Sequence, residues 1–203
     1  MINLKRCHWV IEEEPLYVAY HDNEWGIPVY DDNKLFEMLV LESFQAGLSW
    51  LCVLKKRASI RESLDMFNYK KIANYQEDKV KELLQNPKII RSRRKIEATI
   101  KNAQIFISIQ KEWGSFSKYI WHFTNGNIIY NKTGDERTTS PLSDEVSKDL
   151  KRRGMKYVGS IIIYSYLQAI GIINDHEKEC FCYLGKIKRI EEYDENNNKR
   201  IRK

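Results

Sequence analysis

The chain has 203 residues, 42% of them hydrophobic and 31% charged, so it can bury one sizeable core or two small lobes that share it. No apolar run approaches the ~18 residues of a membrane span, and the N-terminus lacks an export signal, so we expect a cytoplasmic protein. The net charge of +6 suits a polyanionic partner, but residues 186–203 hold seven Lys/Arg against four Asp/Glu, which leaves the body only mildly basic.

Helical periodicity accounts for most of the chain, and only residues 127–131 suggest an isolated strand. The expected helices cover about residues 15–25, 31–45, 50–67, 69–73, 76–84, 115–123, 142–153 and 160–173, a long helix entered through residues 88–95 runs to about 111, and a long surface loop covers 124–141. The predicted fold class is therefore all-α. We expect one globular unit in residues 1–185 and a charged, disordered tail in 186–203.

The helix expected to end near residue 45 carries an acid on its apolar face. Glu42 shares the buried stripe of Leu35, whereas a solvated helix would turn a glutamate outward. Ser49 can cap the next helix, which would begin at Trp50. An anion beside an aromatic face suits a flat, electron-poor ligand. The alternative is a structural acid tied to an arginine or to backbone amides.

Cysteine and histidine lie at both ends of the chain. Cys7 and His21 lie near the N-terminus, and His176 and Cys180 stand at i and i+4 of an expected helical turn, with Cys182 as a substitute ligand. Two cysteines and two histidines form a closed tetrahedral zinc set without a water position, so this site would be structural. The alternative is buried free cysteines and surface histidines. No HExxH is present, which argues against a metallohydrolase.

A basic cluster stands at the entry to the long helix that runs to about residue 111. It comprises Lys88, Arg91, Arg93, Arg94 and Lys95. Such a cluster is either a solvated helix face or a hairpin that presents backbone amides and cations to phosphates. The sequence contains no Walker loop, no GxGxxG and no GxSxG.

Short stretches of distinctive sequence occur in order over about residues 6–185. The most specific are Tyr-His-Asp-Asn-Glu-Trp-Gly at 20–26 and Gln-Ala-Gly-Leu-Ser-Trp at 45–50. Further stretches lie at residues 6–10, 15–19, 35–39, 41–42, 53–57, 89–91, 95–96, 153–154, 157–159, 164–165, 174–176, 180 and 182–183. Together they resemble the 3-methyladenine DNA glycosylase I family.

The resemblance implies an all-α, helix-hairpin-helix glycosylase of two helical lobes, with a zinc clip that joins the N- and C-terminal segments. It implies a hydrolase of N-glycosidic bonds in DNA base-excision repair, which flips and releases 3-methyladenine from alkylated double-stranded DNA. No lyase step is implied, because the family lacks the catalytic aspartate and lysine of other helix-hairpin-helix glycosylases. One structural Zn²⁺ is the implied cofactor, and we expect a monomer.

The resemblance also implies roles for particular residues. Glu42 and Tyr20 would form the catalytic site by reading the flipped base, and the aromatic residues of the pocket would be Trp50, Trp9, Tyr17 and Trp25. The zinc ligands would be Cys7, His21, His176 and Cys180. The DNA contacts would come from Lys88, Arg91, Arg93 and Lys95.

Two departures from the family pattern accompany this similarity. Phe44 stands where some relatives have a polar residue, and the hairpin at residues 86–96 lacks the glycine that usually allows close approach to a phosphate. Two other classes of protein compete with a glycosylase. A zinc-stapled nucleic-acid-binding module would need no recessed acid with an aromatic wall, and a helical adaptor would hold Glu42 in an ion pair.

Overall fold

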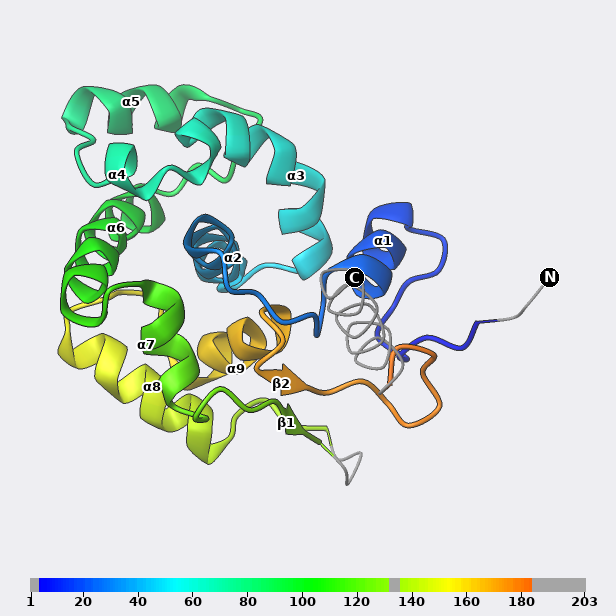
Figure 1. The fold of residues 1–203 in the computed structure, drawn as a ribbon. Coiled ribbons are helices and arrows are strands. Elements are labelled where there is room, and N and C mark those ends of the chain that lie inside the picture. The colour runs from blue at the N-terminus through cyan, green and yellow to red at the C-terminus, as the bar shows by residue number, and fades with distance from the viewer. Residues whose placement is uncertain (1–3, 132–135, 184–203) are drawn as a thin grey trace, which may run out of the picture.

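The computed structural model describes residues 4–131 and 136–183. This part of the chain is mostly helical, as predicted (Figure 1). The elements are α1 (Pro15–Asn23), α2 (Asp32–Gln45), α3 (Trp50–Ser63), the 3-10 turn η1 (Asp65–Phe67), α4 (Tyr69–Ile72), α5 (Glu77–Gln85), α6 (Arg93–Trp113), α7 (Phe116–His122), β1 (Ile129–Tyr130), α8 (Pro141–Arg152), α9 (Ser160–Ala169) and β2 (Ile173–Asn174). The tail predicted at 186–203 lies outside the described residues.

Helix α2 lies at the centre of the helical body. Figure 1 shows it surrounded by other helices, and it packs against α3, α6, α7 and α9. Every residue from Leu35 to Phe44 is buried, so the helix has no solvated face. Phe44, which departs from the family pattern, is a core residue that is 1% exposed. Because the helix is buried on all sides, two of its acids, Glu37 and Glu42, lie inside the protein.

Side-chain caps fix the starts of α2 and α3. The side chain of Asp31 caps α2 by accepting a hydrogen bond from the Lys34 amide. The side chain of Ser49 caps α3 in the same way, accepting from the Cys52 amide, so α3 begins at Trp50. Helix α3 ends at Ser63, earlier than predicted, because residues 65–67 all have positive φ angles.

The last helix is shorter than predicted, and a small sheet takes its place. Helix α9 ends at Ala169, and Gly171 follows with φ +73°. A Cβ at Gly171 would lie 2.4 Å from the carbonyl carbon of Ile27, so only glycine fits this turn. β2 then pairs in parallel with β1, in the register Ile129↔Ile173. The residues that follow the two strands are thereby brought side by side.

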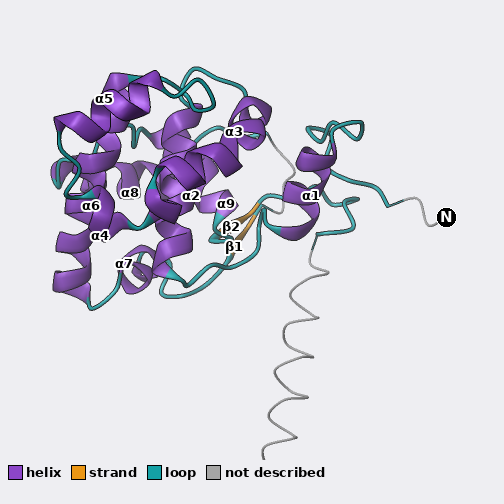
Figure 2. Cartoon of the chain, turned by 90° about the horizontal axis from the view of Figure 1, so that it is seen from above, coloured by secondary structure: helices purple, strands orange, loops and turns teal. Residues whose placement is uncertain are grey.

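Helix α1 packs against α3 and lies to one side of the larger group of helices (Figure 2). It ends at Asn23, two residues before the predicted end. None of the described helices has the length and apolar character needed to cross a membrane.

Candidate functional site

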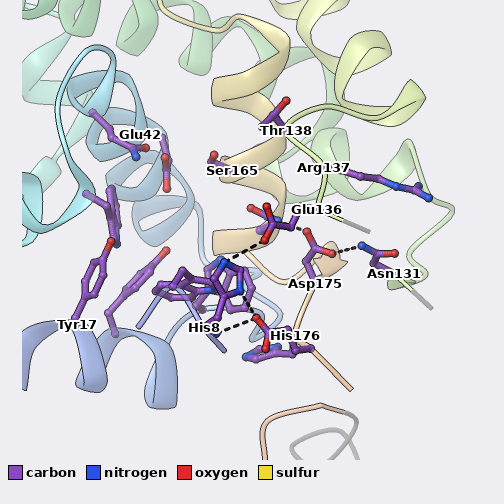
Figure 3. A pocket seen from close by; sticks show the side chains of 17 residues that line it. His8, Tyr17, Glu42, Asn131, Glu136, Arg137, Thr138, Ser165, Asp175 and His176 are labelled. Carbon is purple, nitrogen blue, oxygen red and sulfur yellow. Dashed lines mark hydrogen bonds and ion pairs between the residues drawn. The ribbon is translucent and has the colours of Figure 1, made fainter. Parts of the chain in front are cut away.

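A cavity of about 460 Å³ lies between α1, the end of α2, the start of α3 and the chain that follows β1 and β2 (Figure 3). Its aromatic lining consists of Trp9, Tyr17, Tyr20, Trp25 and Trp50. The remaining lining residues are polar or charged: His8, Glu42, Gln45, Asn131, Glu136, Arg137, Thr138, Ser165, Gln168, Asp175, His176 and Glu177. The structure therefore brings all six residues of the predicted base site to one cavity.

Glu42 is the buried acid of this cavity. It is 3% exposed, and its Oε2 has no hydrogen-bond partner within the described chain. Figure 3 shows its side chain directed into the cavity. Burial raises the pKa of Glu42 to about 8. No ion pair to Glu42 occurs among the described residues, so the alternative of a structural Glu–Arg pair is wrong for this residue. A ligand that brings positive charge or an N–H group would satisfy the carboxyl.

Tyr20 and Trp50 form the surface beside this acid. Their ring centroids lie 5.0 Å apart at an angle of 55°. Burial, reinforced by the charge of Glu42, raises the pKa of Tyr20 well above its ordinary value, so the phenol stays protonated and can donate a hydrogen bond. The indole Nε1 of Trp50 is buried and has no acceptor within the described chain. The cavity therefore offers a flat apolar surface bordered by polar atoms that can bind a ligand.

Three further aromatic residues connect this surface to the chain ends. Trp9 packs edge-on against Tyr17 at 5.5 Å and against Trp25 at 4.9 Å between ring centroids. Trp25 in turn lies 4.5 Å from the ring of His176. Gly26 allows this close packing, because a Cβ there would lie 2.5 Å from Cε1 of His176.

A group of buried cysteine and histidine side chains lies directly behind these aromatic residues. The candidate ligand atoms of His21, His176, Cys180 and Cys182 all lie within 4.8 Å of one another. Nε2 of His21 is 3.4 Å from Sγ of Cys180. This group of side chains could hold a metal ion. The segment from His176 to Cys180 is not helical, as its spacing had suggested, but an irregular turn.

The surroundings of both histidines fit a metal site. Nδ1 of His21 lies 2.7 Å from Oδ1 of Asp22, and Arg6 holds the same carboxylate through Nε and Nη2. Nδ1 of His176 lies 3.2 Å from Oδ1 of Asn174. A histidine that binds a metal through one ring nitrogen characteristically hydrogen-bonds an oxygen through the other, which fixes the orientation of the ring. Here Nδ1 of each histidine faces the oxygen, which leaves Nε2 for a metal.

The position of the fourth predicted ligand differs from the expected set. Cys7 is buried, and a hydrogen bond to Cys180 together with burial raises the pKa of its thiol. Hydrogen bonds from Cys182, Cys7 and His21 lower the pKa of Cys180, so it is the thiolate of the group. Cys182, predicted only as a substitute, lies within the 4.8 Å group, whereas Cys7 borders it at Cys180.

The predicted basic hairpin connects α5 to α6. Lys88 and Arg91 are exposed there. Arg93 is paired with Glu77 and Glu97 at the start of α6, so its charge is partly matched within the protein. In place of glycine, the turn uses Asn86, whose side-chain oxygen accepts a hydrogen bond from the Lys88 amide at 2.9 Å.

Lys95 corrects one prediction. It is 9% exposed, and its Nζ donates to the main-chain oxygens of Phe44 at 2.7 Å and of Ala46 at 2.6 Å. Its ammonium group points into the protein and binds the end of α2, so in this structure it is not presented at the surface as a phosphate contact would require.

The sequence did not assign roles to several polar residues of the cavity. Asp175 accepts hydrogen bonds from Tyr164 and Gln168 of α9 and from Asn131, and the bond from Asn131 follows from the pairing of β1 with β2. Gln45 stands within one of the most distinctive stretches and next to Ala46, so its stretch already indicated the site.

A helical body with an aromatic-lined pocket, whose buried Glu42 has no ion pair among the described residues, suits a flat, electron-poor ligand. A model of the methyladenine glycosylase family matches residues 9–183. The chain therefore belongs to the methyladenine glycosylase family.

Characterised relatives match nearly the whole chain. The DNA-3-methyladenine glycosylase 1 of Escherichia coli (strain K12) is 46% identical over 185 residues, which cover 90% of this chain and 98% of the relative. The DNA-3-methyladenine glycosylase of Haemophilus influenzae is 43% identical, with 87% and 97% covered. A crystal structure of a 3-methyladenine DNA glycosylase I has a TM-score of 0.84 at 47% identity and covers 88% of this chain and 99% of its own. A variant of another such glycosylase, solved in complex with 3-methyladenine, has a TM-score of 0.83 at 36% identity, with 86% and 95% covered.

Proposed function

We propose that this protein is a monofunctional DNA glycosylase that flips 3-methyladenine out of alkylated double-stranded DNA and releases it by hydrolysis. The observation that carries the proposal is Glu42, a buried carboxyl whose Oε2 has no hydrogen-bond partner among the described residues and whose side chain is directed into an aromatic cavity. Two relatives that match most of the chain are named for the same activity. Action as a monomer in the cytoplasm is a further prediction from the sequence.

Release of 3-methyladenine requires little proton transfer from the protein. Methylation at N3 makes adenine cationic and weakens its bond to the sugar. The electron pair of that bond leaves with the base, which departs neutral, and water adds to the oxocarbenium-like sugar and gives its proton to solvent. No strong general acid is needed. The protein must extrude the nucleotide at a cost of a few kcal/mol, select the damaged base and exclude normal adenine.

The residues of the cavity suit this selection. A cationic base favours the ionised form of the Glu42 carboxyl, and the ionised carboxyl attracts positive charge more strongly in a desolvated pocket than it would in water. Trp50 presents an indole face to the cationic ring, and Tyr20 supplies a protonated hydroxyl at the base edge. Normal adenine is neutral, so it offers no charge to the buried carboxyl. The preference for the methylated base follows from that difference.

The Cys/His group supports a second proposal, one structural Zn²⁺ that clips the N-terminal segment to the C-terminal segment. The ligand set implied by the family resemblance is Cys7, His21, His176 and Cys180, and Cys182 competes with Cys7 for the fourth position. Four such ligands close a tetrahedral site without a position for water, so the metal would stabilise the fold and take no part in base release.

Base release from methylated DNA tests the main proposal. Genomic DNA treated with a methylating agent is incubated with the protein, and the released bases are separated by chromatography. We expect 3-methyladenine from treated DNA and no adenine from untreated DNA. DNA binding without base release would favour a zinc-stapled binding module. Neither binding nor release would favour a helical adaptor.

A further inference from the structure

A lysine buried beneath the end of α2 has no role in the chemistry above. Lys95 lies in the first turn of α6, and its Nζ donates to the main-chain oxygens of Phe44 and Ala46. The last carbonyls of a helix lack partners within the helix and carry partial negative charge, so a cation is favoured there. Burying an ammonium group is nevertheless costly. Burial accordingly lowers the pKa of Lys95.

The two carbonyls belong to the segment that shapes the base pocket. Phe44 follows Glu42 by two residues, and Ala46 precedes Trp50 by four. Between them the chain leaves the helix, and Gly47 turns it with φ +78°. Both carbonyls lie on the α2 side of Gly47, so Lys95 fixes the end of α2 from which the turn leads to Trp50. Among the described residues, no other side chain donates a hydrogen bond to these two carbonyls.

The same lysine belongs to the hairpin helix. It follows the basic hairpin residue Arg91 by four residues. A second lysine contact reaches the hairpin from α3, because Nζ of Lys56 lies 3.4 Å from the Pro87 oxygen and 3.3 Å from the Lys88 oxygen. Lysine side chains thus tie the hairpin and the start of α6 to α3 and to the end of α2.

We propose that Lys95 is a positioning residue, which fixes the pocket turn between Glu42 and Trp50 relative to the hairpin that would bind the DNA backbone. This inference rests on the proposed glycosylase function. Its physical basis is that a base flipped from DNA bound at the hairpin must reach the carboxyl and the indole at one fixed separation. A displacement of about 1 Å can lower a reaction rate about a hundredfold. A shift of the turn would therefore impair release while DNA binding is retained.

The test compares Lys95→Met with a matched control, Lys111→Met, an exposed lysine at the far end of the same helix. Three quantities are measured well below the melting temperature: DNA affinity as a function of salt, affinity for free 3-methyladenine, and the single-turnover rate of its release from methylated DNA. For Lys95→Met we expect an unchanged salt slope and a release rate lowered about 10- to 100-fold. We expect Lys111→Met to match the wild type in all three.

Each alternative has its own outcome. A salt slope reduced by about one unit would make Lys95 a phosphate contact and overturn the proposal. A normal release rate in folded Lys95→Met would overturn it as well. Lys95→Gln keeps a donor without the charge, so it should fold and retain an intermediate rate. If neither variant folds, Lys95 is a determinant of the fold and the positioning role is wrong. Absence of release by the wild type would instead refute the glycosylase function.

Discussion

Glu37 and Glu42 lie five residues apart on α2, and they are 4% and 3% exposed, yet only Glu37 has cationic partners. Oε1 of Glu37 accepts from Nε of Arg57 at 2.8 Å, and Arg61 lies 3.4 Å from Oε2. Glu42 has no ion pair within the described chain, and it faces the cavity. One helix thus carries both a structural acid and an acid that is available to a ligand.

This contrast makes Glu42→Gln an informative substitution. The change keeps the shape of the side chain and removes its ability to ionise beside a cationic base, so the fold should persist while binding of 3-methyladenine and its release from DNA both weaken. The loss should correspond to one charge-assisted contact of about 1.5–3 kcal/mol. Thermal melting and base release are measured on the same preparation. A variant that melts early but releases the base normally once folded would refute the recognition role.

Glu37→Gln is the matched control for that experiment. It removes a charge from the same helix, but here the charge belongs to a buried ion pair with Arg57, which keeps Glu24 as its other partner. We expect a loss of about 1–3 kcal/mol in the free energy of unfolding and little change in release rate at temperatures where the variant is folded. Equal loss of activity in both variants would mean that burial, and not ligand contact, explains the effect of Glu42.

Stability should depend on pH through Glu42. Its pKa is raised from 4.5 to about 8 by burial, so between these values the folded protein holds a proton that the unfolded chain has released. The contribution of this group to stability is therefore greatest at low pH, declines as pH rises from about 4.5 to 8, and is constant above. The unfolding free energies of the wild type and of Glu42→Gln are measured from pH 5 to 9. The difference between them should change by a few kcal/mol across this range. A constant difference would contradict the raised pKa.

Metal content and stability should change together at the Cys/His group. Cys7→Ser and His176→Ala should lower bound zinc and the free energy of unfolding, the latter by several kcal/mol. Cys182→Ser is the decisive comparison, because it should leave the metal in place if Cys7 is the fourth ligand. Less than about half an equivalent of zinc in wild-type protein purified without chelator would refute the closed tetrahedral site.

Arg91 is the best candidate for a phosphate contact. It is exposed in the basic hairpin, and Arg91→Ala should weaken DNA binding across all sequences. The slope of log affinity against log salt should flatten by about 0.9 for one lost contact. Lys111→Ala removes an equal charge from the other end of α6 and should leave the slope unchanged. An unchanged slope in folded Arg91→Ala would make Arg91 an ordinary solvated residue.

The features that the sequence predicted correctly depend on residue type and on contacts between near neighbours in the chain. Ser49 predicted where α3 begins, because a cap depends only on its own side chain and the next three residues. The mostly helical class followed from periodicity, and the family followed from distinctive stretches such as residues 45–50. Three of the four predicted metal ligands gather in one buried group, since residue types restrict a zinc site strongly.

Only the tertiary structure decided which charged residues are paired, buried or exposed. Glu37 and Glu42 both lie on a helix covered on all sides, and their different roles depend on whether Arg57 or a cavity lies opposite. Lys95 looks like its basic neighbours in the sequence, but the end of α2 lies beneath it and takes its ammonium group. The pairing of β1 with β2 joins residues 44 positions apart. Periodicity and capping describe contacts between near neighbours in the chain, whereas these features depend on contacts that form only when distant segments pack together.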